Sequence, residues 1–177
     1  STPFDFSPHE GDLVQALGEA IGDGERYGKS NEKEEWIAFW SEPVGGAGFG
    51  EPPPEADAAV AGAGWLVRQG KPAVDREDEP YPRTAVGLDE DRRRLWLVVV
   101  DGKQPRYSEG MSLRELAALF ISLGSADAIH LDGGGSAAMA ARDERGRPAL
   151  LSRPCHTKIP GRPRPVANFL GLVFRTQ

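Results

Sequence analysis

Three stretches decide the fold expected for this chain: LWLVVVD at 95–101, SLRELAALFISLG at 112–124 and AIHLDGGGS at 128–136. The first and third are short and apolar, which predicts buried strands, with 95–100 a central strand covered on both faces. The second predicts a helix, because Ser112 and Glu115 form a capping box, apolar residues recur at helical spacing and Gly124 supplies a stop. A strand, a helix and a strand in this order predict two parallel strands joined by a crossover.

The rest of the chain predicts mostly strands and turns. We expect one hairpin from 64–68 and 72–74, with glycine at its turn, and another from 84–88 and 95–100. Further strands are expected at 35–40, 138–141 and 167–174, a Gly/Pro-rich loop at 45–54, and either a helix or a strand at 13–21. The expected fold class is therefore α/β (or α+β): a mixed β-sheet with a central strand-helix-strand crossover, flanking hairpins and few helices.

Composition narrows the classes of function. The chain has 177 residues, 39% of them hydrophobic, which fits a single domain over 1–177. Its apolar runs are too short to cross a membrane, so we expect no membrane insertion. The net charge of −6 disfavours nucleic acid as a partner and favours a small-molecule or glycan ligand. Cys155 is the only cysteine, which excludes an internal disulfide. Oligomeric state stays open.

Two aspartates follow the two crossover strands. Because such strands finish at the same edge of a sheet, Asp101 and Asp132 are expected roughly 5 to 10 Å apart. This range includes the spacing of the paired carboxylates of glycosidases, so both are candidate catalytic residues. The alternative is that each Asp-Gly pair only forms a turn. A divalent cation, Ca or Mg, between the two is a further alternative, although two carboxylates are a weak metal signal; no cofactor is required and no metal ligand is assigned.

Candidate phosphate ligands surround the second aspartate. Three consecutive glycines let backbone amides approach an anion, Ser136 adds a hydroxyl, and arginines grip phosphate through paired hydrogen bonds. The candidate binding residues are Arg83, Gly133, Gly134, Gly135, Ser136, Arg164 and Asn168. The alternatives are a plain loop, solvated arginines and an asparagine bonded to the backbone. The segment 153–164 contains four basic residues and no acidic one, which supports a local anion site.

Five short sequence motifs follow one another along the chain. They are PRTA at 82–85, VVVDG at 98–102, SEGMS at 108–112, LDGGGS at 131–136 and RPVAN at 164–168. In order and spacing they resemble the phosphodiester glycosidase domain family, most strongly over 64–174. Lysosomal members of this family remove N-acetylglucosamine from a phosphodiester-linked sugar.

The resemblance implies a hydrolase that cleaves a glycosyl-phosphodiester bond in a glycan or cell-envelope substrate. It places the arginines and the glycine loop at the phosphate and the carboxylates at the glycosidic bond. It also favours a bacterial protein outside the cytoplasm, periplasmic or secreted. The Asn-Gly-Gly-Phe-Phe phrase of the family is absent, so we expect a chain that is N-terminally incomplete relative to the family.

Two other functions stay open on these residues. One is a metal-dependent phosphodiesterase that breaks the P–O bond. The other is a non-catalytic domain that binds a sugar phosphate or glycan, which Ala137 and Ala138 favour, because the family usually has hydroxyl residues there.

Overall fold

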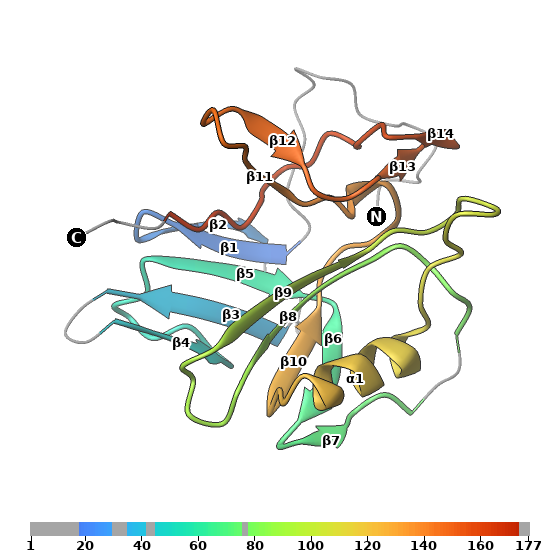
Figure 1. The fold of residues 1–177 in the computed structure, drawn as a ribbon. Coiled ribbons are helices and arrows are strands. Elements are labelled where there is room, and N and C mark those ends of the chain that lie inside the picture. Colours follow the sequence, from blue (N-terminus) through green and yellow to red (C-terminus); the bar gives the residue numbers. More distant parts are fainter. Residues whose placement is uncertain (1–17, 30–34, 42–44, 76–77, 174–177) are drawn as a thin grey trace.

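The computed structural model describes residues 18–29, 35–41, 45–75 and 78–173 (Figure 1). Two five-stranded sheets dominate. The first contains β1 (Gly18–Gly22), β2 (Glu25–Lys29), β3 (Glu35–Trp40), β4 (Gly46–Phe49) and β5 (Ala58–Gly62), in the order β2-β1-β5-β3-β4. The second contains β6 (Gly64–Arg68), β7 (Lys71–Pro72), β8 (Arg83–Leu88), β9 (Leu95–Val100) and β10 (Asp127–His130), in the order β7-β6-β10-β8-β9.

The fold is mainly β, which corrects the expected α/β class with a mixed sheet. Every pair of neighbouring strands within the described ranges is antiparallel. The predicted strand-helix-strand connection is present as β9, α1 (Leu113–Ser122) and β10. β9 and β10 run in the same direction, but β8 lies between them and is antiparallel to both. The sequence predicted the crossover but not the strand inserted into it.

The capping box of α1 is confirmed. The Ser112 side chain accepts a hydrogen bond from the Glu115 backbone N–H, and the Glu115 side chain accepts one from the Ser112 backbone N–H. Gly124 follows the C-cap with a φ of 85°, a conformation that suits glycine. Both predicted hairpins, β6–β7 and β8–β9, are also confirmed.

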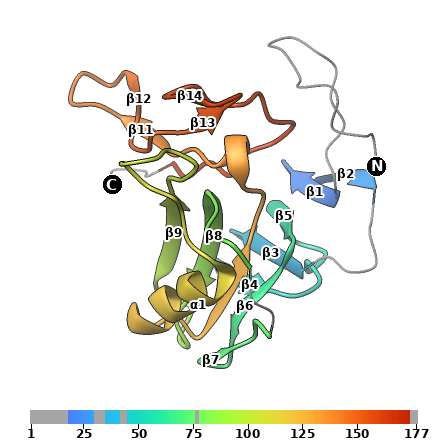
Figure 2. The same ribbon diagram turned by 90° about the vertical axis from the view of Figure 1, so that its right-hand side faces the viewer.

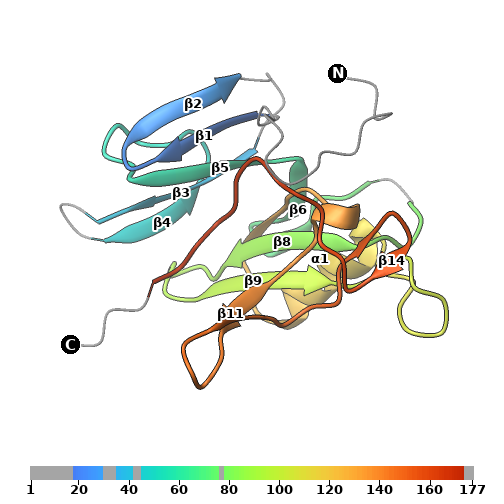
Figure 3. The ribbon, with the colours of Figure 1, turned by 90° about the horizontal axis from the view of Figure 1, so that it is seen from above.

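Two of the three core clusters lie on opposite faces of the second sheet, and the third, around Ile21, Ala38 and Ala59, belongs to the first sheet. Leu116 and Phe120 of α1 pack on one face against Leu66 and Ala85. On the other face, Val86 and other side chains of the second sheet pack against the first sheet. The two views at right angles show α1 on the face away from the first sheet (Figures 1 and 2), and Figure 3 shows the two sheets side by side.

Several predicted elements need correction. β9 is the edge strand of the second sheet rather than a central one, although residues on both of its faces contact the core. The expected loop at 45–54 contains β4. Residues 167–173 form no strand, and Phe169 and Val173 are 87% and 89% exposed. A β-prone composition does not suffice without a neighbouring strand to accept its hydrogen bonds. Residue 174 lies outside the described ranges.

Other predictions hold in part. The strand at 35–40 is β3, and the one expected at 138–141 is β11 (Ala140–Arg142), which pairs with β12 (Pro148–Leu150). Of the stretch 13–21, the described part begins β1, and 13–17 lie outside the described residues. The basic segment 153–164 contains a short hairpin, β13 (Cys155–His156) and β14 (Ile159–Pro160). No helix of the described residues is long and apolar enough to cross a membrane.

Candidate active site

The candidate site lies where β8 begins and β9 and β10 end. Arg83 pairs with Val100 of β9, and Ala85 pairs with His130 of β10, so Asp101 and Asp132 both follow their strands at this end of the sheet. Across the sheet, Asp101 and Asp132 lie two strand spacings apart, and along the strands they are offset by about one residue. Together these separations put their Cα atoms about 10 Å apart. The segments with β11 to β14 lie over this end in both side views (Figures 1 and 2).

Arg164 joins the second aspartate to the serine of the glycine loop. Its Nη2 atom donates a 2.8 Å hydrogen bond to Oδ2 of Asp132, and its Nε atom donates a 3.0 Å bond to Oγ of Ser136. Nη2 also bonds to the same hydroxyl. The Arg164 side chain is 23% exposed and that of Asp132 is 71% exposed, so the ion pair opens to solvent on the carboxylate side. Three of the predicted site residues therefore meet.

The glycine loop forms a single 3-10 turn, η1 (Gly134–Ser136), and the glycines allow close packing around it. A Cβ atom at Gly133 would lie 2.6 Å from the Pro82 carbonyl oxygen, and one at Gly135 would lie 2.9 Å from Nδ1 of His156. Gly134 has a φ of 63° and approaches the hydroxyl of Tyr81. Larger side chains at these positions would displace their neighbours.

The loop amides mostly serve the fold, contrary to the expected anion nest. Gly133 N–H donates to Oδ1 of Asp132 and Gly134 N–H donates to the Pro82 carbonyl. The amides of Ser136 and Ala137 donate to carbonyls within the loop. The side chains of Arg164 and Ser136 offer anion donors at this loop.

Asp101 is held by a second set of partners. Its two carboxylate oxygens accept 2.8 and 2.9 Å hydrogen bonds from the Arg153 backbone N–H, and Oδ2 accepts a 2.9 Å bond from the Tyr107 hydroxyl. This bond, together with the negative charge of Asp101, raises the pKa of Tyr107, so the phenol stays protonated at neutral pH. The Arg153 guanidinium lies 5.0 Å from the centre of the Tyr107 ring.

One short segment connects the surroundings of the two aspartates. Arg153 bonds to Asp101, and three residues later the buried His156 packs its ring against Gly135. Three residues span about 10 Å when extended, which matches the separation inferred from the strand register. Cys155 between them is buried and is not disulfide-bonded.

Arg83 lies at the same end of the sheet, but the partners of its guanidinium are others than Asp132 and Arg164. Its Nε atom donates a 3.0 Å bond to the Met111 carbonyl, and Nη2 pairs with the Asp78 carboxylate. The other oxygen of Asp78 accepts a 2.8 Å bond from the Leu113 backbone N–H, at the start of α1. With a side chain only 15% exposed, Arg83 connects β8 to this helix.

The remaining predictions have mixed outcomes. Asn168 is half-buried in the irregular C-terminal segment, and none of the side-chain hydrogen bonds found in the described part of the chain involves it. Ala137 is buried at 1% exposure, so a hydroxyl residue there would point into the protein, whereas Ala138 is exposed. No group of three or more His, Cys, Asp or Glu side chains among the described residues could hold a metal ion.

Sequence reasoning missed the residues that orient the site. Tyr107 and Arg153 lie in loops and His156 lies in the two-residue strand β13, and their spacing carries no recognisable ligand pattern. The available signal for His156 is its position in the basic segment 153–164. Contacts between loops far apart in sequence depend on the tertiary fold, which periodicity does not report.

Comparisons with known proteins concern the family and the fold. The sequence model of the phosphodiester glycosidase family matches residues 7–173. The structure is similar to the catalytic domain of zebrafish N-acetylglucosamine-1-phosphodiester alpha-N-acetylglucosaminidase, auto-inhibited by its pro-peptide. The TM-score is 0.63 and the identity 26%, over 79% of this chain and 51% of the zebrafish chain. This chain thus spans about half of the zebrafish chain.

A second similarity is local. The chain is 35% identical over 82 residues to the SPbeta prophage-derived uncharacterized protein YomE of Bacillus subtilis (strain 168). This stretch covers 43% of the present chain but 12% of that protein.

Proposed function

Since this chain belongs to the phosphodiester glycosidase family, we propose that it hydrolyses a glycosyl phosphodiester at the bond between the anomeric carbon and the phosphate oxygen. The observation that carries the proposal is the position of Arg164, whose guanidinium contacts both the Asp132 carboxylate and the Ser136 hydroxyl. A phosphate-binding cation and a candidate catalytic carboxylate thus share one small region at the end of the sheet.

The phosphate is assigned to Arg164 and Ser136. A guanidinium can bind phosphate through two parallel hydrogen bonds and keeps its charge at any working pH. The serine hydroxyl that now accepts from Arg164 rotates to donate to a phosphate oxygen. The loop glycines keep this surface close to the backbone, because a Cβ at Gly135 would also lie 3.3 Å from the Cβ of Arg164.

The chemistry of the leaving group explains why an arginine lies in the proposed site. Breaking the C–O bond releases a phosphate monoester, whose second pKa is about 6, so it departs near neutral pH without a strong general acid. A cation that stabilises the developing negative charge lowers the barrier more than a proton donor would. Arg164 is placed for this role.

The two aspartates divide the remaining work. Asp132 orients the Arg164 guanidinium through their 2.8 Å ion pair, and because it therefore lies next to the phosphate it does not serve the opposite face of the sugar. We assign to Asp101 the role of base: it takes a proton from water while the water oxygen bonds to the anomeric carbon and the C–O bond to phosphate breaks. The Arg153 N–H and the Tyr107 hydroxyl orient this carboxylate.

The proposed sugar is N-acetylglucosamine, and the proposed substrate is a glycan or cell-envelope component met outside the cytoplasm. Support comes from the zebrafish protein, whose name gives N-acetylglucosamine-1-phosphodiester as its substrate. Arg83 and Asn168 are left out of the phosphate contacts, because Arg83 is bonded to Asp78 and Met111, and Asn168 lies in the irregular C-terminal segment.

The test uses N-acetylglucosamine 1-(4-nitrophenyl phosphate). Hydrolysis on the sugar side releases 4-nitrophenyl phosphate, which is colourless until alkaline phosphatase is added. We expect colour only with phosphatase, and a loss of about a hundredfold or more in both Asp101→Asn and Asp132→Asn with the circular dichroism spectrum unchanged.

The matched control is Asp143→Asn, which alters another aspartate that forms an ion pair with an arginine through Nη2, here Arg147, in the turn between β11 and β12. It should keep full activity. Colour without phosphatase would show cleavage on the aryl side and contradict the proposal, as would full activity in either site variant.

A further inference from the structure

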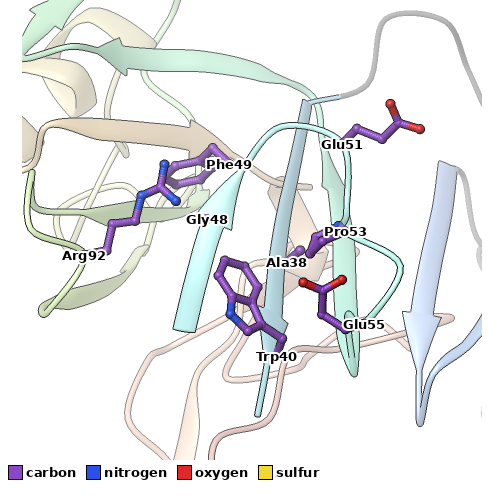
Figure 4. Close-up of a pocket in the computed structure, with 8 residues that line it drawn as sticks. All are labelled: Ala38, Trp40, Gly48, Phe49, Glu51, Pro53, Glu55 and Arg92. Atoms are coloured by element: carbon purple, nitrogen blue, oxygen red, sulfur yellow. The ribbon is translucent and has the colours of Figure 1, made fainter. Parts of the chain in front are cut away.

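A hollow lies on the first sheet, outside the proposed active site. It has a volume of about 270 Å³ and is lined by Trp40, Gly48, Glu51, Glu55 and Arg92, among others. Figure 4 shows the Trp40 ring over β3 and β4 with the Glu55 carboxylate nearby, and Arg92 reaching toward β4 from the turn between β8 and β9. The volume is close to the lower end of ligand-binding pockets, which suits one small ring.

The hollow exists because of glycines in β4. A Cβ at Gly46 would lie 2.8 Å from Cζ2 of Trp40, so only glycine lets the indole lie against this strand. At Gly48, a Cβ would lie 3.1 Å from Nη1 of Arg92 and 3.3 Å from the Trp40 ring. Glycine within a strand weakens it and often marks a place where another group approaches the backbone closely. Here the two glycines let Trp40 and Arg92 each approach the backbone of β4.

The lining combines an aromatic face with donors and acceptors. Trp40 offers a flat apolar surface, the Arg92 guanidinium offers hydrogen-bond donors, and Glu51 and Glu55 offer acceptors. Two carboxylates against one guanidinium leave the lining with a net negative charge, which disfavours phosphate and other anions. A pyranose has an apolar C–H face and a rim of hydroxyls that both donate and accept, so it matches each of these groups.

We propose that this hollow binds a neutral pyranose residue of a glycan. The sugar stacks its C–H face on Trp40, and its hydroxyls bond to the carboxylates of Glu51 and Glu55 and to the Arg92 guanidinium. This site goes beyond the proposed hydrolysis and does not depend on it. β8 runs from Arg83, beside the proposed active site, to Leu88, beside the turn that carries Arg92, a distance of about 17 Å.

The experiment titrates the whole, 15N-labelled chain and follows the indole N–H signals of its four tryptophans. The probes are N-acetylglucosamine, glucose, galactose and mannose, together with choline as a cation and inorganic phosphate as an anion. Trp40→Phe assigns the Trp40 signal. We expect at least one sugar to shift this signal saturably at millimolar concentration, with no saturable shift from choline or phosphate.

The matched pair of variants is Arg92→Gln and Arg93→Gln, two exposed arginines of the same turn, of which only Arg92 lines the hollow. Arg92→Gln should weaken sugar binding by about tenfold, and Arg93→Gln should leave it unchanged. The proposal is overturned if no sugar shifts the Trp40 signal saturably, if choline or phosphate does so instead, or if the two variants bind alike. Hydrolysis of the phosphodiester substrate should be equal in both variants, so failure here is distinguishable from failure of the proposed function.

Discussion

Nη2 of Arg164 lies 2.8 Å from Oδ2 of Asp132, although 32 positions separate the two residues in sequence. The Arg164 backbone N–H also donates a 3.0 Å bond to the Gly135 carbonyl oxygen, so the arginine is attached to the loop through both its main chain and its side chain. This double attachment brings the basic segment 153–164 against the glycine loop. The proposed phosphate site therefore depends on the fold of two segments and not on one motif.

Replacing Arg164 tests whether the forked guanidinium matters or only its charge. Arg164→Lys keeps the charge but cannot bond to Asp132 and Ser136 in the same geometry. We expect kcat/KM for the phosphodiester substrate to fall by about a hundredfold, with the melting temperature nearly unchanged. Arg162→Lys, an exposed arginine of the same segment, serves as the control. Activity of Arg164→Lys within about twofold of the parent would remove Arg164 from the site.

Gly135→Ala tests the close packing behind the loop. The new methyl would lie 2.9 Å from Nδ1 of His156 and 3.3 Å from the Cβ of Arg164, so the loop or the hairpin must shift. We expect lower activity and a loss of about 1 to 3 kcal/mol in the free energy of unfolding. At Gly45 the nearest atoms would lie 3.7 Å away, so Gly45→Ala should be tolerated.

A double-mutant cycle attributes this effect to the histidine. In the His156→Ala background, Gly135→Ala should cost clearly less stability, because the ring that blocks the methyl is gone. Strictly additive losses would show that His156 is not the obstacle.

Arg83 was expected at the phosphate, but its bonds to Asp78 and the Met111 carbonyl indicate a structural role. We therefore expect Arg83→Met to lower the free energy of unfolding by about 2 to 3 kcal/mol, since it leaves the Asp78 carboxylate without its cation. In the fraction that stays folded, KM should be nearly unchanged. A large rise in KM without loss of stability would restore Arg83 to the phosphate site.

The capping box predicts a pH dependence of stability. The pKa of Glu115 is lowered from its ordinary value of 4.5, first by the hydrogen bond from the Ser112 backbone and then by the Ser112 side chain. Because the pKa is lower in the folded state, the stabilisation is present above pH 4.5 and is lost as the pH falls through the folded value. Glu115→Gln should thus be less stable than the parent at neutral pH and equal to it at low pH.

Urea unfolding across this range measures that difference, with Glu144→Gln in the turn between β11 and β12 as the control. A gap between parent and Glu115→Gln that stays constant down to low pH would contradict the assignment.

The helix and the hairpins could be predicted because their signals are local. Ser112, Glu115 and Gly124 mark the two ends of α1 within a few residues of sequence, and Gly70 marks a tight turn. The position of β8 between β9 and β10 could not be predicted, because strand order depends on which edges meet in three dimensions. The same limit explains why the apolar run 95–100 predicts a central strand, although this strand lies at an edge of the sheet.

For the site, the sequence pointed to the residues but not to their partners. Asp132, Ser136 and Arg164 carry a recognisable pattern, and the structure brings them together. Arg83 also lies in one of the five family motifs, yet its guanidinium pairs with the Asp78 carboxylate. The other oxygen of that carboxylate accepts a hydrogen bond from the Leu113 N–H at the start of α1. A charged side chain bonds to whichever acceptors the fold places nearest, and sequence spacing does not show these.

The central claim is that water attacks the anomeric carbon and not phosphorus. Both routes on the sugar side give N-acetylglucosamine and 4-nitrophenyl phosphate, so the products alone do not distinguish them. Hydrolysis in oxygen-18 water, followed by mass spectrometry of both products, does. We predict one oxygen-18 atom in the sugar and none in the aryl phosphate; label in the phosphate would contradict the glycosidase assignment.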